Sequence, residues 1–497
     1  MILLCLIAVI VILSYRFLYR PHKYWLERGV IQGNPKPLLG HFMGTTFHKQ
    51  SFADCIQMVY NMAPNSRYCG MYQFTMPTLV VRDPDLIKQI TVKDFDYFLN
   101  HRTFIPEECD ALWGKNLFAL TNQKWRDMRS TLSPAFTGSK MKFMFPLISE
   151  TAEYFIRHFL SKQEDVVTVE MKDAFTRFTN DVIANTAFGV SCDSLKEREN
   201  EFYLMGKEAT DLKGFWKNIK LLLFFLIPQV FKLCKVRFFS KSVANFFTNL
   251  IKGNITKREE FGIVRPDMIY LLMEARKNVS NEPISDEDIT AQALIFFFAG
   301  FDTVSSAMCF MSYELATNPE IQEKLLQEID SVEGKPTYDT LMNLKYLDMV
   351  VSETLRKWPI SVATDRICNK PYTIEPKSPD KRPLLLEKNL AVWIPVYALH
   401  RDPNYFPDPN RFDPERFNEE NKANIKPYTY LPFGLGPRNC IGSRFALLEM
   451  KILFFYILSH FEITPIPRTQ IPLKINKTQF ALTAEDGFWL GLKRRQK

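Results

Sequence analysis

The chain lacks the clusters of charge and cysteine that mark several classes of protein. Its 497 residues contain no block of lysines and arginines that would follow a phosphate backbone, and the net charge is only +8. Nucleic acid is therefore not an expected partner. The nine cysteines include no C-x-x-C pair, which argues against a zinc or dithiol motif and for a reducing compartment in which most cysteines are small buried hydrophobic residues.

No internal repeat or low-complexity tract interrupts residues 41–497, so we expect them to form one domain. No Gly-rich fingerprint for a flavin or nicotinamide cofactor is present either. Phenylalanine is abundant, with 42 residues, which fits an ordinary aromatic core and fits an internal apolar cavity equally well. The modest basic excess is compatible with an acidic partner or an anionic membrane surface.

The N-terminus is expected to be a membrane anchor over residues 1–20. Residues 1–13 are uninterrupted apolar sequence, and with Arg16 snorkelling, residues 1–19 can cross a bilayer at ~1.5 Å per residue. No positive segment precedes the run and no small-x-small site follows it, so a cleaved signal peptide is the weaker alternative. Arg16, Arg20, Lys23 and Arg28 follow the run, which predicts a cytosolic body.

A linker rich in proline and glycine is expected over residues 21–40, and the body from residue 41 should be mostly α with a smaller β region. The strand candidates are residues 68–74, 78–81, 390–396 and a stretch near the C-terminus. The longest helix is predicted over residues 289–318, after a Ser285 cap with acidic residues in the first turn and before Pro319. A second apolar run, residues 221–227, predicts either a membrane-surface contact or a buried helix.

The strongest functional motif is the loop Phe433–Gly442. Two glycines and a proline make a tight turn that presents backbone N–H groups inward, and Cys440 lies at its end, just before a predicted helix over residues 443–459. The positive end of a helix dipole favours a thiolate, and a Cys thiolate is one of the axial ligands that proteins give to haem iron. A buried hydrophobic cysteine in a turn is the alternative for Cys440 taken alone.

This loop resembles the haem-binding signature of the cytochrome P-450 superfamily, Phe-x-x-Gly-x-Arg-x-Cys-x-Gly, at every fixed position. The resemblance implies the cytochrome P-450 fold, a single catalytic domain over residues 41–497 behind an N-terminal membrane anchor, and haem b with Cys440 as the iron ligand. It covers the chain from the anchor to the C-terminus, because the further matches below occur in the same order.

Two motifs resemble the family's structural lock. Glu353 and Arg356 stand three residues apart, on one face of a predicted helix. The resemblance implies that Arg416, in Pro-Glu-Arg-Phe, completes a buried triad with them, since a planar guanidinium can bond a carboxylate through two N–H groups. A surface salt bridge is the alternative for either motif alone.

Inside the long helix, Ala299 to Thr303 resemble the family's oxygen-activating segment. The small residues Ala299 and Gly300 leave room beside the haem, and the Thr303 hydroxyl can bond helix carbonyls and open a local groove for water. Asp302, expected to be buried in mid-helix, is hard to explain unless it is paired or functional. The resemblance implies that Asp302 and Thr303 relay protons; a polar kink in the helix is the alternative.

The haem propionates need cationic or N–H partners, and the resemblance supplies candidates. Trp125 and Arg129 match a Trp-x-x-x-Arg helix, and Arg366 and Arg438 also stand where the family contacts the propionates. Phe433 begins the Cys loop, and His101 occupies a position where relatives often have Arg or His. A solvated surface cation is the alternative for each basic residue.

The family's substrate-lining segments correspond to mostly apolar residues of this chain. They are Phe104, Phe118, Ala119, Ile295, Phe298, Ala299, Ile360, Ser361, Val362, Ala363, Phe480, Ala481 and Leu482. They include no charged anchor, which predicts a lipophilic substrate held by shape and burial. Core packing is the alternative for any single phenylalanine.

Within the superfamily, residues 112–146 and 487–490 most resemble the microsomal insect detoxification families. The resemblance implies a monooxygenase of the endoplasmic reticulum membrane, facing the cytosol, that inserts one atom of O2 into a xenobiotic such as an insecticide or plant toxin, or into an endogenous lipid or hormone. Electrons would come from NADPH through a separate flavoprotein reductase, with cytochrome b5 as a second candidate donor. A reductase-independent haem-thiolate isomerase or dehydratase and a non-catalytic haem or lipid carrier are the alternatives.

Overall fold

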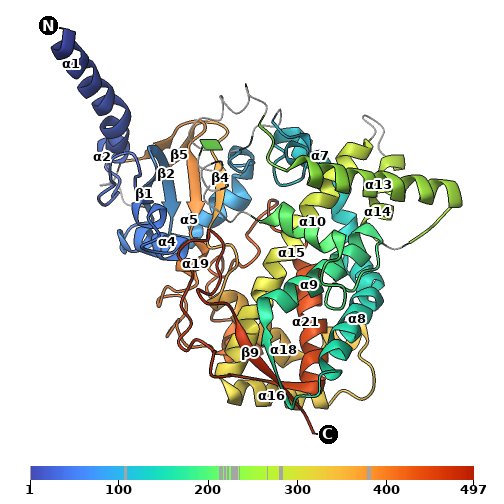
Figure 1. Ribbon diagram of the computed structural model, residues 1–497. Helices are drawn as coiled ribbons and strands as arrows, with labels where there is room; N and C mark the ends of the chain where they lie inside the picture. The colour runs from blue at the N-terminus through green and yellow to red at the C-terminus, as the bar shows by residue number, and fades with distance from the viewer. Residues whose placement is uncertain are drawn as a thin grey trace.

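The computed structural model describes the whole chain except residues 1, 104, 106–108, 212–216, 218–219, 221–222, 225–232, 234–235, 266, 279–283, 378–381 and 497. The described chain forms a strand-rich part near the N-terminus and a larger helical part (Figure 1). The predicted class, mostly α with a smaller β region, is confirmed.

The elements alternate long helices with short helical turns and short strands. The longer helices are α1 (Ile2–Ser14), α4 (Phe52–Asn61), α7 (Asn122–Leu132), α8 (Gly138–Leu160), α9 (Met171–Ile183), α10 (Glu201–Thr210), α13 (Lys241–Phe261), α14 (Met268–Asn278), α15 (Asp286–Thr317), α16 (Pro319–Asp330), α18 (Lys345–Lys357) and α21 (Ser443–His460). The short helical segments are η1 (Tyr15–Tyr19), η2 (Arg20–Lys23), α2 (Tyr24–Glu27), α3 (Met43–Thr46), α5 (Pro84–Lys88), η3 (Gln89–Lys93), η4 (Phe95–Tyr97), α6 (Ala111–Gly114), η5 (Ser133–Phe136), η6 (Ala184–Phe188), α17 (Tyr338–Met342), α19 (Val396–Leu399), η7 (Pro414–Phe417) and α20 (Glu419–Lys422).

The strands form small sheets. They are β1 (Tyr68–Gln73), β2 (Met76–Val81), β3 (Val166–Glu170), β4 (Thr364–Ile367), β5 (Tyr372–Ile374), β6 (Leu384–Leu386), β7 (Ala391–Ile394), β8 (Phe461–Thr464) and β9 (Trp489–Arg494). One sheet has the order β1-β2-β7-β4, with β2 and β7 parallel, and a second has the order β3-β9-β8. All four predicted strand regions are confirmed. In the first sheet Arg366 of β4 pairs with Val392 of β7, which fixes the position of that arginine.

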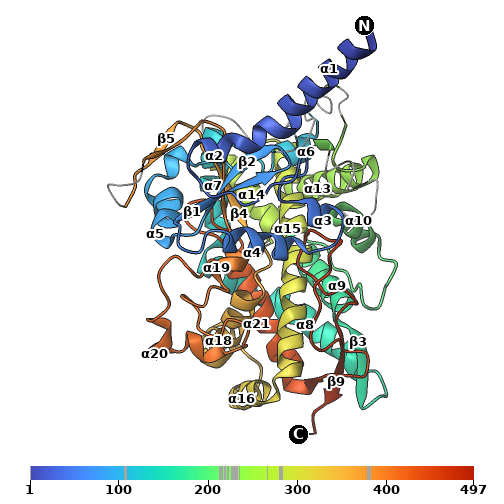
Figure 2. The ribbon, with the colours of Figure 1, turned by 90° about the vertical axis from the view of Figure 1, so that its left-hand side faces the viewer.

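Helix α15 is the axis of the helical part, and it runs along the height of the body in Figure 2. It begins three residues before the predicted start, because Ser285 and Asp288 form a capping box in which each side chain accepts the other's backbone N–H. The side chains on both sides of its middle are buried. Among the described residues it is the one helix long and apolar enough to cross a membrane, but 61% of its most apolar window is buried, so it is a core helix.

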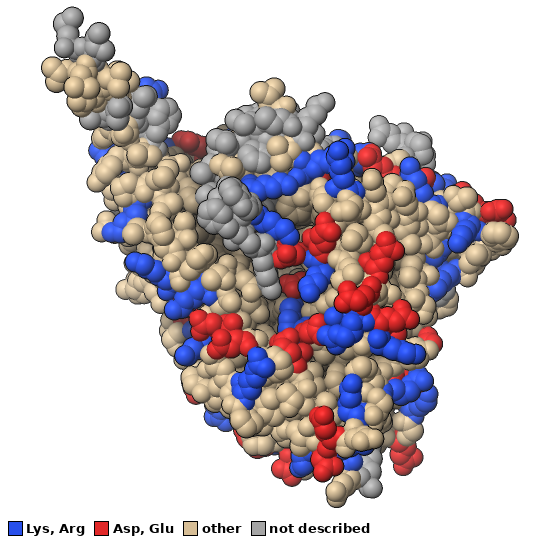
Figure 3. Space-filling model, viewed as in Figure 1, with Lys and Arg blue, Asp and Glu red and all other residues tan. Residues whose placement is uncertain are grey.

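The N-terminal segment projects from the body as helix α1 (Figure 1), and helical turns continue from it to Glu27. The apolar side chains that the structure describes in it are exposed, among them Leu3, Leu4 and Ile12. In Figure 3 the projecting helix shows no charged side chain before its base. Helix α1 alone, with 13 residues, is shorter than a bilayer span, so the anchor over residues 1–20 stays a prediction.

Trp25 joins this segment to the body. Its side chain is fully buried, its indole N–H donates to the Met71 carbonyl at 3.1 Å, and its backbone N–H donates to the Tyr72 hydroxyl at 3.1 Å. Gly70 is required opposite it, because a Cβ there would overlap the indole ring. The turn after the projecting helix is therefore fixed on strand β1.

The second apolar run, residues 221–227, lies mostly outside the described residues. Phe224, which the structure describes, is buried, and the Lys220 ammonium donates to the Arg237 carbonyl. These two contacts fit the buried-helix prediction for that part of the run.

Candidate active site

The Cys440 loop has the geometry that its sequence predicts. Gly434 and Gly436 both have φ of +74°, a conformation that only glycine adopts without strain. A Cβ on Gly436 would also overlap the Thr91 carbonyl oxygen. The loop closes when the Cys440 N–H donates to the Phe433 carbonyl at 2.9 Å, and α21 then begins at Ser443.

The Cys440 side chain is accessible, although protein surrounds it closely enough that burial raises the pKa of its thiol. The Gly442 N–H and Arg129 oppose this shift without cancelling it. Desolvation therefore outweighs the lowering of the thiol pKa that the helix N-terminus is predicted to cause. For the Cys440 thiol to lose its proton here, a further positive charge must lie beside it. A coordinated metal ion supplies such a charge.

Two buried arginines beside the loop have no acidic partner. Arg366 is fully buried and Arg438 is 8% exposed; no carboxylate in the described chain lies within 4.0 Å of either guanidinium. Burial lowers the pKa of Arg366 to about 10 and, together with repulsion from Arg366, the pKa of Arg438 to about 9. The Arg366 Nε–H has no hydrogen-bond partner among the described residues. Two unneutralised cations next to an accessible thiol fit the two propionates and the iron of a haem.

Trp125 and Arg129 of α7 contact the Cys440 loop. The Arg438 guanidinium lies over the buried Trp125 ring at 4.2 Å from the centroid. Arg129 donates to the Asn439 carbonyl at 2.9 Å and to its side-chain Oδ1 at 2.8 Å. Arg129 therefore holds the residue before Cys440 in place, and its charge lowers the pKa of Arg438 further.

His101 joins this group through Asp365. Its Nδ1 lies 2.9 Å from the Asp365 carboxylate, which also accepts the Arg102 backbone N–H at 2.6 Å. Burial lowers the pKa of His101, although Asp365 opposes the shift, and the same contacts hold the pKa of Asp365 below its ordinary value. His101 and Asp365 thus lie beside Arg366, and contact of His101 with a propionate stays a prediction.

Glu353, Arg356 and Arg416 come together. The Arg356 guanidinium bonds both Glu353 oxygens, at 2.7 and 2.8 Å, and both side chains are fully buried. Arg416 Nε lies 3.6 Å from Glu353 Oε1, close enough for charge attraction, while its Nη2 donates to the Asp408 carbonyl at 2.8 Å. The three residues therefore form the cluster that the sequence predicts, and within it Arg356 makes the two short contacts with Glu353.

His400 extends this cluster to the Cys loop, and the sequence analysis missed it. Its Nδ1–H donates to the Arg356 carbonyl at 3.0 Å, and its Nε2 accepts the Leu431 N–H at 2.8 Å, two residues before Phe433. Arg356 in turn donates to the His400 carbonyl at 2.9 Å. These partners fix the neutral tautomer, and burial, then the Arg356 charge, lower its pKa to about 3.

The middle of α15 is accessible where both ends are buried. Ala299 and Thr303 are exposed, one helical turn apart on one face. The Thr303 hydroxyl donates to the Ala299 carbonyl, which leaves its oxygen lone pairs to accept another hydrogen bond. The hydroxyl thus bonds a helix carbonyl as predicted, but α15 continues without a break, so the predicted groove is not seen.

The prediction that Asp302 is buried is wrong. Its side chain is 43% exposed, and one oxygen lies 2.8 Å from the Lys172 ammonium of α9. Lys172 also donates to the Asp302 carbonyl and to the hydroxyls of Ser305 and Ser306. Asp302 lies about 100° around the helix from Thr303, so the pair predicted to act together occupies two faces.

Two of the expected substrate-lining phenylalanines share a neighbour that we did not predict, Trp113. Phe118 and Phe298 make edge contacts with its ring at centroid distances of 6.3 and 6.0 Å. Phe118 also stacks on His101 at 5.2 Å. Trp113 lies in residues 112–146, the segment that most resembles the insect families. That resemblance could have identified it as a candidate residue.

The remaining substrate candidates differ in their exposure. Ala119, Ile295, Ile360 and Ala363 are half-buried, Ser361 is exposed, and Val362 is buried just before β4. Phe104 lies outside the described residues. Phe480 is 70% exposed and stacks on Phe52 at 4.1 Å, with Ala481 exposed and Leu482 buried, so no described contact brings Phe480 to Phe118 or Phe298.

Because His400 stays neutral in the folded protein, it should make stability sensitive to acid. An unfolded chain takes up a proton at this histidine below about pH 6.5, whereas the folded chain does so only near its pKa of about 3. Stability should therefore be lost as pH falls through this window, by about 2 kcal/mol at pH 5. In His400→Gln this loss should be absent, which urea unfolding at pH 7 and pH 5 would measure.

His48→Gln is the control, because His48 is exposed. A His400→Gln protein that lost as much stability between the two pH values as the wild type would contradict the assignment.

Comparison with known proteins agrees with this geometry. The sequence profile of the cytochrome P450 family matches residues 32–490. The chain is 46% identical to cytochrome P450 9e2 of Blattella germanica, with 98% of this chain and 97% of that protein covered. It is 43% identical to probable cytochrome P450 9f2 of Drosophila melanogaster, covering 99% and 98%, and 38% identical to cytochrome P450 9b2 of the same species, covering 98% of each. The chain belongs to the cytochrome P450 family and is a haem-dependent monooxygenase.

Proposed function

We propose that this monooxygenase oxidises lipophilic compounds at the cytosolic face of the endoplasmic reticulum membrane, with electrons that a separate flavoprotein reductase takes from NADPH. The observation that carries the proposal is the accessible Cys440 thiol in a loop whose Arg438 contacts the Phe118 backbone, with Phe118, Phe298 and Trp113 forming an aromatic cluster. Such a cluster selects apolar molecules by shape and burial.

Haem, when bound, supplies the activation of O2 and the transfer of one oxygen atom to the substrate. Cys440 would hold its iron, and Arg366, Arg438 and His101 would hold its propionates, with Trp125 and Phe433 packed beside them. The loop amides that follow Cys440 stabilise a thiolate, since the Gly442 N–H lowers its pKa. The residues present therefore fit the group.

Proton delivery is assigned to Asp302 and Thr303 acting in sequence. Asp302 lies on the accessible side of α15, where it can exchange protons with solvent once it leaves Lys172. The Thr303 hydroxyl, anchored to the Ala299 carbonyl, can accept a hydrogen bond and hold a proton-bearing group on the other face. Lys172 controls this route because it holds the Asp302 carboxylate in the ion pair.

The substrate is proposed to be a xenobiotic, such as an insecticide or plant toxin, or an endogenous lipid or hormone. Support comes from the absence of a charged side chain among the expected lining residues and from the similarity to insect relatives. Cytochrome b5 is a second candidate electron donor. Near the Cys loop, Arg444 is a candidate docking residue, although its Nη1 already donates to the Phe136 carbonyl at 3.3 Å.

Cys440→His tests the iron ligand. The imidazole would replace the thiolate, so the red-shifted Soret band of the ferrous carbonyl complex should disappear from the absorption spectrum. Cys192→Ser is a matched control, because a hydroxyl can replace the thiol that donates to Asp181 at 3.2 Å; it should keep the band. Survival of the band in Cys440→His would refute the ligand assignment.

Thr303→Ala tests the proton route. Without the hydroxyl, NADPH consumption should continue while product formed per NADPH falls and hydrogen peroxide release rises, since one positioned proton-transfer group contributes about 10²-fold or more to its step. Thr303→Ser, which keeps the hydroxyl, should stay close to the wild type. An isomerase or a carrier would form no product at the expense of NADPH in either protein. If Thr303→Ala formed as much product per NADPH as the wild type, Thr303 would not belong to the proton route.

Deleting residues 2–20 tests the anchor. Most of the protein should move from the membrane to the soluble fraction, because the deletion removes the exposed apolar side chains of α1, whereas Trp25 keeps its contacts with β1 and haem binding should persist. Fractionation and the carbonyl spectrum measure the two outcomes. Asn254, Asn278 and Asn476 each begin an Asn-x-Ser/Thr sequon, and glycosylation of any of them in cells would contradict a cytosolic body.

A further inference from the structure

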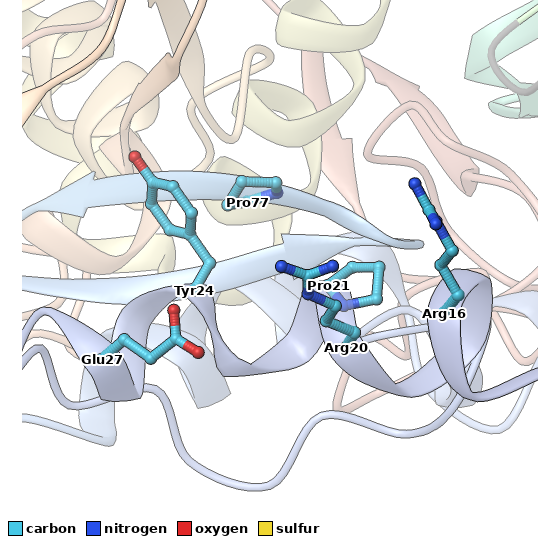
Figure 4. Close-up of a pocket in the computed structure, with 6 residues that line it drawn as sticks. All are labelled: Arg16, Arg20, Pro21, Tyr24, Glu27 and Pro77. Carbon is cyan, nitrogen blue, oxygen red and sulfur yellow. The ribbon is translucent and has the colours of Figure 1, made fainter. Parts of the chain in front are cut away.

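A pocket of about 340 Å³ lies where the N-terminal helical segment meets strand β2, away from the Cys440 loop (Figure 4). Its lining residues are Arg16, Arg20, Pro21, Tyr24, Glu27 and Pro77. The first five come from the turns that follow α1, and Pro77 comes from β2. Neither the fold nor the oxidation chemistry requires a pocket at this place.

Charge is separated along the pocket. Figure 4 shows Arg16, Arg20, Tyr24 and Glu27 in that order along the helical segment, with the arginines at one end and Glu27 at the other. Within the described part of the chain, no acidic side chain lies within 4.0 Å of Arg16 or Arg20, and no basic one lies within that distance of Glu27. The pocket therefore offers a cationic end and an anionic end, both free to pair with a ligand.

Tyr24 lines the pocket between the arginines and Glu27 (Figure 4). Burial raises the pKa of its hydroxyl, so this part of the wall carries no charge. The ring is held in place, since the Arg28 guanidinium lies 3.6 Å from its centroid.

We propose that this pocket binds the head group of a phospholipid that carries a primary ammonium, such as phosphatidylethanolamine. The two guanidiniums bind the phosphate, as arginine forks do elsewhere, and the Glu27 carboxylate binds the ammonium. The inference rests on the proposed membrane location: the pocket begins at the base of the apolar helix, where head groups lie if residues 1–20 span the bilayer.

The walls of the pocket are rigid. Pro21 and Pro77 fix their own backbone angles, and Trp25, next to Tyr24, is fully buried against β1. A preformed site of this kind loses little entropy on binding. A bound head group would therefore hold the catalytic domain at a fixed orientation to the membrane surface.

The test is a binding titration of the full-length protein in non-ionic detergent, read by native mass spectrometry. The probes are short-chain phosphatidylethanolamine, phosphatidylcholine and phosphatidylglycerol, together with free phosphoethanolamine. The wild type should bind phosphatidylethanolamine about tenfold more tightly than the other two lipids, the factor expected for one charge-assisted hydrogen bond. Equal binding of free phosphoethanolamine would overturn the lipid assignment in favour of a soluble phosphate ester.

Variants separate the pocket from general surface charge. Glu27→Gln should weaken phosphatidylethanolamine binding about tenfold and strengthen phosphatidylglycerol binding, because it removes the group that binds the ammonium and repels an anion. Arg16→Gln with Arg20→Gln should weaken binding of every lipid. Lys23→Gln, in the same segment but outside the lining, is the control and should change little.

Two results would overturn the proposal. One is a Glu27→Gln effect of the same sign on both lipids, and the other is a loss in Lys23→Gln equal to that in the double arginine variant. A third variant, Pro77→Trp, keeps every charge and fills the pocket, so unchanged binding in it would also exclude the site. The carbonyl spectrum and turnover should be normal in all variants, so failure here leaves the monooxygenase proposal intact.

Discussion

The burial of two arginines without an acid beside Cys440 is the constraint on which the site depends. Desolvation lowers the pKa of Arg366 and Arg438, the Arg366 charge lowers that of Arg438 further, and the Asp365 charge opposes both shifts. A folded chain tolerates such a pair only where negative charge is delivered to it. Within the described chain, Arg438 donates to the backbone carbonyls of Leu99, Leu117, Phe118 and Leu120. The two propionates of a haem would supply negative charge at this place.

The Cys440 loop is held by a buried cluster, Glu353, Arg356 and His400, that adds little net charge to the site. The Glu353–Arg356 pair compensates its own charge, and His400 transmits the position of α18 to Leu431 through one donor and one acceptor without adding a charge. A protonated His400 would lose its acceptor and face Arg356 and the neighbouring Arg401, which both disfavour its charge. The lock is consequently rigid at neutral pH and sensitive to acid, and it leaves the buried arginines as the unneutralised charges beside the thiol.

The sequence was sufficient where a local pattern decides the structure. Glycines at 434 and 436, the Ser285 cap and Pro319 are short-range signals, and the loop and α15 follow them closely. It was insufficient where a partner comes from a distant segment. His400 bonds residues 44 and 31 positions away, and Lys172 reaches Asp302 across 130 positions, so no local spacing could predict either contact. Phe480 shows the same limit, since its neighbour Phe52 lies on the opposite end of the chain.

The pairing of Asp302 with Lys172 changes how an acid and an alcohol on adjacent residues can cooperate. Neighbours on a helix point about 100° apart, so Thr303 can face an apolar space while Asp302 faces α9. Both faces are accessible, since Thr303 is exposed and the Asp302 side chain is 43% exposed. Lys172 holds both the carboxylate and the carbonyl of Asp302, so it keeps the carboxylate toward α9 and away from the face of Thr303. For the two residues to act on the same proton, Asp302 would first have to leave this ion pair.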